Sequence, residues 1–564
     1  MATTGAILAV ILVGIVAVIG GILVLRLHAF VALVLGAILV GLLTPGSSVE
    51  KWSLDKVAVP FQLTSPELAP ADPDHQGPVP GRPQRAFFAS NVSTNAPLDV
   101  VRFSEATGEF ERVGSLEIES PGTQALWQPS RAGNQLLHTD LVVPLTALDS
   151  AQKLKRQTVG ERVATGFGST CTKIGILIAL ASVVGKCLLD SGAADRIVRS
   201  ALSLLGQRGA GGAFLGSGFL LGIPVFFDTV FYLMIPLGKA MRMRTGGNYL
   251  LYVLCIVAGA SMAHSLVPPT PGPLFVAGEL GVDIGAMILA GSIVGIFTAG
   301  CGYLYATILN RHRELPLRET AELSLKELEA LSQKDESELP GLLVSLLPIL
   351  LPVVLISGVT VVDTFEVAMP STAKHVLKTL GNKNIALLIS AAIALATVAY
   401  QKRSRLGDLA QSIEQSLASG GVIILITAGG GAFGQVLQQT GVAGLIRDLP
   451  EASPALIVTL AFLITAAVRT AQGSGTVAMI TAVGILSGLA TSGQLPFHPV
   501  YLALAIGCGS KPIAWMNDSG FWVIAKMSGM TESEALKYVT PMSCMMGLVG
   551  LLVVVIGVSL FPMA

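Results

Sequence analysis

Long apolar segments follow one another along most of the chain, with short polar loops between them. A helix needs about 20 apolar residues to cross a bilayer, and the longer segments reach that length. Others are shorter or are interrupted by glycine and proline, which is typical of helices that break inside a membrane protein. The apolar segments lie near 5–25, 29–43, 170–189, 212–238, 249–266, 284–309, 340–361, 384–400, 419–437, 454–468, 475–491, 499–515 and 543–562.

The stretch 44–161 departs from this pattern, because it is polar and rich in proline. Its part 66–83 is typical of an extended linker. The segments 85–93, 98–120 and 124–130 are strand-like runs bounded by turn residues. We therefore expect an all-α polytopic membrane protein that carries a small β-rich extramembrane insertion.

The composition is typical of a protein that faces lipid. Hydrophobic residues make up 52% of the chain and charged residues 13%, whereas a soluble domain carries about a quarter of charged residues. The formal net charge is zero, so no nucleic-acid partner is expected. The six cysteines form no CxxC or Cys/His cluster, and we expect neither a metal site nor a cofactor. No HExxH or P-loop motif occurs, so we do not expect an enzyme.

Basic residues gather in three short loops, at 239–244, 311–318 and 402–405. Short loops rich in lysine and arginine stay in the cytoplasm. This distribution predicts that the N-terminus, the 44–161 insertion and the C-terminus lie outside the cytoplasm.

The two halves of the chain resemble each other at an offset near 249 residues, so that Gly192 falls on Gly441 and Ser261 falls on Ser510. With the orientation above, the first copy enters the membrane from outside and the second from inside. The sequence therefore predicts two inverted repeats with broken or re-entrant helices. In such transporters the binding site lies between the repeats, near the middle of the bilayer.

Asp228 lies within an apolar run between Pro224 and Pro236. A carboxyl group at membrane depth is costly and marks a functional site by default. We take Asp228 as the first candidate for a proton-coupling residue. The alternative is a structural carboxylate held in an ion pair.

The segment 259–273 is broken by closely spaced prolines that cannot continue a helix. Its freed backbone groups need partners, so the break should line a cavity or be buried in protein. Thr270 and Gly272 are candidate substrate-binding residues there. His264, at the edge of the break, is either a packing residue or a further candidate for proton exchange.

Two further breaks lie in the second half of the chain, and each precedes a helix start. A helix N-terminus offers free N–H groups and a positive dipole end, which suits a carboxylate. Asp518 can also cap the following half-helix, and it is a further proton-coupling candidate. The candidate substrate-binding residues are Gly473, Ser474, Gly475, Thr476, Asn517 and Asp518.

These segments resemble the gluconate permease family of gluconate:proton symporters, within the larger ion-transporter superfamily. The resemblance covers about 20–43 and nearly all of 162–562. The chain departs from the family's usual residues at Asp228, Thr270, Lys511 and Trp515, and typical members lack the 44–161 insertion. The motifs that carry the resemblance are FFDTVF at 226–231, HSLVPPTPGP at 264–273, GGGAF at 429–433, GSGTVAMITA at 473–482 and NDSGFW at 517–522.

The resemblance implies proton-coupled symport of a sugar acid, gluconate-like, or of a related small hydroxycarboxylate across the inner (cytoplasmic) membrane. The expected partners are thus a small organic anion, protons and the lipid bilayer. A sodium- or proton-coupled symporter of another carboxylate or an amino acid is the alternative. A membrane sensor whose insertion binds a ligand is a third reading, and a homo-oligomeric state stays open.

We divide the chain into five parts on this basis. N-terminal membrane helices occupy 1–43 and the extracytoplasmic insertion 44–161. The first transport repeat occupies 162–310, a cytoplasmic loop with connecting helices 311–400, and the second transport repeat 401–564.

The orientation is open to a direct test. Protease added to intact spheroplasts should cut within 66–83, because the basic loops predict that the insertion is outside. The cut is detected from the size of the fragments. Protection in spheroplasts, together with cutting in inverted vesicles, would reverse the predicted topology.

Overall fold

The computed structural model describes the chain in several stretches, and Asn517 and the expected linker 66–83 lie outside them. The chain forms two compact units, which are described separately below. The first comprises Met1–Ile15, Gly36–Ala164 and Gln435–Asp448, and the second comprises Val16–Leu35, Thr165–Gly434 and Leu449–Ala564. The described residues are 4–59, 61–63, 85–87, 97–119, 124–131, 134–137, 140–318, 339–402, 406–441, 453–491, 495–516 and 518–563.

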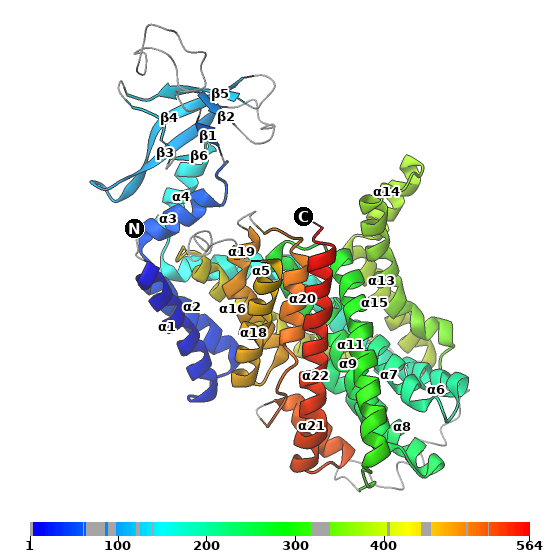
Figure 1. Cartoon of the computed structure of the whole chain (residues 1–564). Coiled ribbons are helices and arrows are strands. Elements are labelled where there is room, and N and C mark those ends of the chain that lie inside the picture. The colour runs from blue at the N-terminus through cyan, green and yellow to red at the C-terminus, as the bar shows by residue number, and fades with distance from the viewer. Residues whose placement is uncertain are drawn as a thin grey trace. The chain divides into compact units, whose positions relative to one another are not determined.

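The first unit contains a six-stranded antiparallel sheet with the strand order β1-β2-β5-β4-β3-β6 (Figure 1). Side chains of one face, among them Val100 and Trp127, form one small core, and Val101 and Phe110 of the other face pack against two short helices. The expectation of a β-rich insertion is confirmed. The strands are β1 Gln62–Leu63, β2 Arg85–Phe87, β3 Leu98–Ser104, β4 Glu109–Glu119, β5 Gln124–Pro129 and β6 Leu141–Pro144, and the helices are α3 Gly46–Asp55 and α4 Ala147–Arg156.

Ion pairs fasten these two helices to the sheet. Glu50 of α3 is fully buried and accepts hydrogen bonds from the Phe110 backbone N–H and from Lys155 of α4, each at 3.3 Å. Lys155 also donates to Glu109 of β4 at 2.8 Å, and this bond lowers the pKa of the Glu109 carboxyl group. One lysine therefore joins α4 both to α3 and to the sheet.

Helices make up the rest of the described chain, and nine of them are long and apolar enough to cross a membrane, or ten if the bent pair α2–α3 is one span. The expectation of a polytopic helical protein is confirmed. The helices outside the insertion are α1 Thr4–Leu23, α2 Ala29–Leu43, α5 Val159–Asp190, α6 Ala193–Leu205, α7 Ala210–Leu221, α8 Phe227–Thr245, α9 Tyr249–Leu266, α10 Pro271–Leu280, α11 Ile284–His312, α13 Leu342–Thr364, α14 Ser371–Leu380, α15 Lys383–Lys402, α16 Leu406–Gln438, α18 Pro454–Gln472, α19 Gly475–Thr491, α20 Val500–Gly509, α21 Ser519–Ser528 and α22 Glu532–Leu560.

The apolar segment 212–238 is two helices and not one. A break at 222–226 separates α7 from α8. Pro224 explains the break, because proline has no N–H to donate and its ring clashes with the carbonyl four residues earlier in a helix. Asp228 consequently lies in the first turn of α8 and not in the middle of a span.

The two expected repeats appear as matching helices. The pairs α8 and α19, α10 and α21, and α11 and α22 each begin 248 residues apart. The half-helices α10 and α21 both have 10 residues, and α11 and α22, which lie side by side in Figure 1, both have 29. Gly192 and Gly441, which the sequence alignment equates, both adopt a positive φ, of 77° and 90°.

The repeats exchange their half-helices. The half-helix α10 of the first copy packs against α19 of the second, and α21 of the second packs against α8 of the first. The basic residues 239–244 lie at the end of α8 and not in a loop. An ion pair of Arg242 with Glu314 places them beside the basic segment 311–318, and Arg318 of that segment binds Glu534, at the start of α22, through two bonds of 2.6 and 2.9 Å.

The close packing of α7 against α9 predicts a stability effect at Gly259. A Cβ atom there would overlap the Leu215 carbonyl oxygen and lie 2.8 Å from the Phe219 nitrogen. Gly259→Ala should therefore lower stability by roughly 1–3 kcal/mol, the usual cost of overpacking. The thermal midpoint of the purified protein in detergent measures the effect.

Gly300→Ala on α11 is the matched control. It gives a helix the same gain in propensity, but a Cβ at Gly300 meets nothing within 4 Å. Equal thermal midpoints for both variants would contradict the packing between α7 and α9.

Candidate functional site

A cavity of about 370 Å³ lies between the two repeats of the second unit, and we call it the central cavity. Three helices, α8, α19 and α21, begin at it, and side chains of α9, α18 and α22 complete its wall. Its lining residues that carry polar or charged side chains are Asp228, Thr229, Ser261, His264, Ser265, Arg469, Ser474, Thr476, Ser510, Lys511, Asp518, Ser519 and Ser543.

Two of the helices that begin here are capped by their own side chains. The Ser474 hydroxyl oxygen accepts a hydrogen bond from the Val477 backbone N–H at 3.3 Å at the start of α19. The Asp518 Oδ1 atom accepts from the Gly520 N–H at 2.9 Å at the start of α21. Serine and aspartate are favoured at this position because they satisfy N–H groups that the helix leaves free. The capping role expected of Asp518 is thus observed.

Arg469 of α18 is the charged residue that sequence reasoning missed. Its Nη2 atom forms an ion pair with Asp518 Oδ2, and its Nε donates to the Ser510 carbonyl oxygen at 3.0 Å. The arginine side chain is only 6% exposed, so the pair is largely withdrawn from water. The available signal was a single arginine at the end of an apolar segment, directly before the Gly473 break.

Lys511 supplies a second cation from the break that follows α20. Its Nζ atom donates to the Ser261 carbonyl oxygen of α9 at 2.8 Å. Ser261 and Ser510 are the positions that the repeat equates, so each of two equivalent carbonyls holds one cation of the cavity. Among the residues that the structure describes, no carboxylate pairs with Lys511.

Asp228 and His264 face the same cavity. The Asp228 carboxylate makes no hydrogen bond or ion pair with any described residue, although Asp518, Arg469 and Lys511 all line the same wall. His264 presents its ring edge to Phe226 with centroids 6.2 Å apart, and its Nδ1 atom is buried without a partner in the described chain.

The break near Pro268 lies elsewhere. The Thr270 hydroxyl donates to the Val267 carbonyl at 2.8 Å, and Gly272 packs closely against Met479 of α19. Neither lines the central cavity, and Gly473 adjoins it only as the cap of α18, with a φ of 84°.

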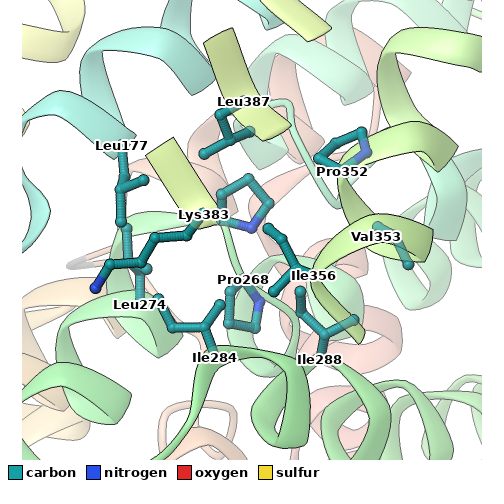
Figure 2. A pocket seen from close by; sticks show the side chains of 11 residues that line it. Leu177, Pro268, Leu274, Ile284, Ile288, Pro352, Val353, Ile356, Lys383 and Leu387 are labelled. Carbon is teal, nitrogen blue, oxygen red and sulfur yellow. The ribbon is translucent and has the colours of Figure 1, made fainter. Parts of the chain in front are cut away.

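A separate apolar crevice contains the two prolines of this break. Figure 2 shows side chains from α5, α10, α11, α13 and α15 converging there, with the aliphatic stem of Lys383 among them. The residues that line the crevice are Leu177, Pro268, Pro269, Leu274, Ile284, Ile288, Pro352, Val353, Ile356, Lys383 and Leu387. This break therefore contributes packing surface, and the polar chemistry lies at the other three breaks.

The central cavity combines two cations, Arg469 and Lys511, and two carboxylates, Asp228 and Asp518, with helix N-termini and several hydroxyl groups. Two repeats of membrane helices that enclose such a cavity define a membrane transporter.

Sequence comparison gives the particular family. The sequence profile described as GntP family permease matches residues 140–560, and the chain belongs to this family. It is 34% identical to the gluconate permease of Pseudomonas aeruginosa over 396 residues, 69% of this chain and 86% of the relative. It is 31% identical to the low-affinity gluconate transporter of Escherichia coli K12, over 70% of this chain and 87% of the relative.

Two further comparisons bear on the family and the fold. The Gnt-II system L-idonate transporter of Escherichia coli K12 is 29% identical, over 73% of this chain and 92% of the relative. The crystal structure of the Alcanivorax borkumensis YdaH transporter matches with a TM-score of 0.52 and 13% identity, over 82% of this chain and 94% of that chain. The latter comparison shows a similar fold.

The Arg469–Asp518 pair predicts a large stability effect. Asp518→Asn leaves the buried guanidinium without a countercharge and should destabilise the protein by roughly 3–5 kcal/mol. Glu534→Gln breaks the more exposed pair with Arg318, in which the arginine side chain is 37% exposed, and should cost about 0–1 kcal/mol. Thermal midpoints in detergent compare the two, and an equal loss would show that Asp518 does not compensate Arg469.

Proposed function

We propose that this protein takes up a sugar acid, gluconate-like, or a related small hydroxycarboxylate together with a proton. The observation that carries the proposal is the central cavity between the two repeats, which contains Arg469, Lys511 and the Asp228 carboxyl group, the last without a partner among the described residues. The names of the relatives, gluconate permease and L-idonate transporter, support this class of substrate.

The hydroxyl groups of the cavity fit a polyhydroxy acid. Five of the hydroxyl side chains that line the cavity come from four different helices: Thr229, Ser261, Ser265, Thr476 and Ser543. A hydroxyl group can both donate and accept a hydrogen bond, so a ring of them accommodates the hydroxyls of a sugar acid in either role. The two cations and the helix N-termini attract its carboxylate.

The charges of the cavity support proton coupling. Arg469 forms an ion pair with Asp518, whereas neither Asp228 nor Lys511 forms an ion pair with any described residue. A bound carboxylate neutralises Lys511, and a proton neutralises Asp228. Substrate and proton together therefore leave the cavity without net charge, which lowers the cost of carrying it through a medium of low dielectric constant. Asp518 and His264 are the second-choice proton sites.

Sodium coupling and an amino-acid substrate are the alternatives, since carbonyl groups at broken helices can also bind sodium. The insertion is proposed to lie outside the cytoplasm, and the membrane is proposed to be the inner membrane. Uptake of labelled sugar acids into vesicles, with an imposed pH or sodium gradient, tests the function. Uptake that no sugar acid supports, or that a sodium gradient alone drives, would contradict it.

Asp228→Asn is the decisive variant for coupling. The amide has the size of the acid but takes up no proton, so accumulation driven by a pH gradient should be abolished. Exchange of labelled for unlabelled substrate across the membrane should persist in part, because it needs binding without net proton movement. Vesicle uptake and counterflow measure the two quantities.

Lys239→Gln is a suitable control, because this buried lysine lies on the same helix α8 but does not line the cavity. Accumulation by Asp228→Asn that still responds to a pH gradient would rule out Asp228 as the coupling residue. Asp518 and His264 would then be tested in the same way.

A further inference from the structure

We propose that Lys511 is the residue that binds the substrate's carboxylate, whereas Arg469 acts as a positioning residue that is held by Asp518. This inference rests on the proposed function, and it assigns its carboxylate to one side chain. It also makes Lys511 the residue by which the site distinguishes acids from neutral sugars of the same shape.

The two cations of the central cavity differ in how their charges are compensated. Arg469 has a carboxylate, Asp518, against its guanidinium, and it is 6% exposed. Among the described residues, the hydrogen-bond partner of Lys511 is neutral, the Ser261 carbonyl oxygen at 2.8 Å. A cation that lines a cavity inside a membrane protein without a countercharge is costly. Of the two, Lys511 gains more from an incoming carboxylate.

The hydrogen-bonding capacity of Lys511 leads to the same assignment. An ammonium group carries three donors, and one is engaged with Ser261. The two remaining donors have no partner among the described residues and can bind two carboxylate oxygens, or a carboxylate and a neighbouring hydroxyl. Arg469 uses Nε and Nη2 for Ser510 and Asp518, and only its Nη1 lacks a partner among the described residues.

Asp518 fixes Arg469 and at the same time reduces its attraction for an anion. The aspartate also caps α21 through the Gly520 N–H at 2.9 Å. A carboxylate that replaced Asp518 would break both the ion pair and the cap. Arg469 therefore orients the Ser510 carbonyl and the start of α21.

The position of Lys511 also places its ligand between the repeats. Lys511 belongs to the second copy, and its acceptor Ser261 belongs to the first. Asp228, the other unpaired charge, lies on α8 of the first copy and faces the same cavity. A carboxylate on Lys511 and a proton on Asp228 thus neutralise one charge in each copy.

The test compares the affinities for gluconate and for gluconamide, its neutral amide, in the purified full-length protein by titration calorimetry. The wild type should prefer gluconate. Lys511→Gln should weaken gluconate binding by at least about tenfold, the loss expected for a hydrogen bond to a charged group. Its affinity for gluconamide should stay unchanged, so the preference for the acid should disappear.

Lys511→Arg keeps the positive charge and should keep most of the preference for gluconate over gluconamide. That result would show that the site selects its ligand by charge and not by shape. Arg318→Gln is the matched control, because Arg318 forms an ion pair outside the cavity. It should leave both affinities unchanged. A preference for gluconate that survives in Lys511→Gln would overturn the assignment, and its loss in Arg469→Gln would then give the carboxylate to Arg469.

Binding by the wild type distinguishes a failure of this inference from a failure of the proposed function. If the wild type binds no sugar acid, the proposed function is wrong and the inference is wrong with it. If the wild type binds gluconate and Lys511→Gln shows the same preference, only the role of Lys511 is wrong.

Discussion

The central cavity depends on one constraint: backbone groups at a helix break inside a membrane must find partners within the protein. The Ser510 carbonyl at the end of α20 has lost its place in the helix, and the guanidinium of Arg469 supplies its donor. The Gly520 N–H group at the start of α21 donates to Asp518, which in turn compensates Arg469. An unsatisfied group in this environment costs several kcal/mol. The helix breaks and the charged side chains therefore stabilise one another. The side chains satisfy backbone groups at the breaks, and those groups and the ion pair satisfy the side chains.

The two repeats depend on each other because the half-helices of each copy pack against the other copy. A half-helix of 10 residues cannot cross a bilayer, so α10 and α21 each need a neighbour that covers their ends. Each finds it in the other copy, α10 against α19 and α21 against α8. The exchange brings the starts of α8, α19 and α21 to one place. It also lets equivalent carbonyls, Ser261 and Ser510, hold Lys511 and Arg469.

The copies are nevertheless not equivalent at the cavity. The break of the first copy at Pro268 packs into an apolar crevice, while its counterpart near Asp518 carries the charges (Figure 2). A shared sequence pattern gives the helix lengths but does not say which break becomes polar. That difference comes from single residues: prolines at 268 and 269 offer no N–H group, whereas Asp518 offers a cap.

Local sequence signals were sufficient for much of this fold. Apolar length predicted most of the spans, turn residues predicted β2 to β5 of the insertion but not β1 or β6, and Asp518 caps a helix as expected. These features depend on residues close together in the chain. The sequence also predicted that Ser474 and Asp228 lie at helix breaks or membrane depth, and both line the cavity.

Contacts between distant residues could not be predicted in the same way. Arg469 meets Asp518 across 49 positions, and Lys511 meets Ser261 across 250. Apolar periodicity does not specify which helix ends converge. For this reason Thr270 and Gly272 were candidates for substrate binding on the same grounds as Ser474. In the structure Thr270 bonds to the Val267 carbonyl and Gly272 packs against Met479. The segment 212–238 was long enough for one span, and only the position of Pro224 indicated two helices.

The separation of the two unpaired charges explains how one cavity can serve both ligands. If Asp228 and Lys511 formed an ion pair with each other, their charges would already be compensated, and neither a proton nor a carboxylate would gain much by binding. In the structure both line the cavity, and neither forms an ion pair with any residue that the structure describes. The Ser261 carbonyl of the first copy accepts a hydrogen bond from Lys511. The break at 222–226 places Asp228 at the start of α8. Each charge therefore keeps its affinity for a mobile partner. Because either partner alone leaves one charge uncompensated, the two bind most favourably together.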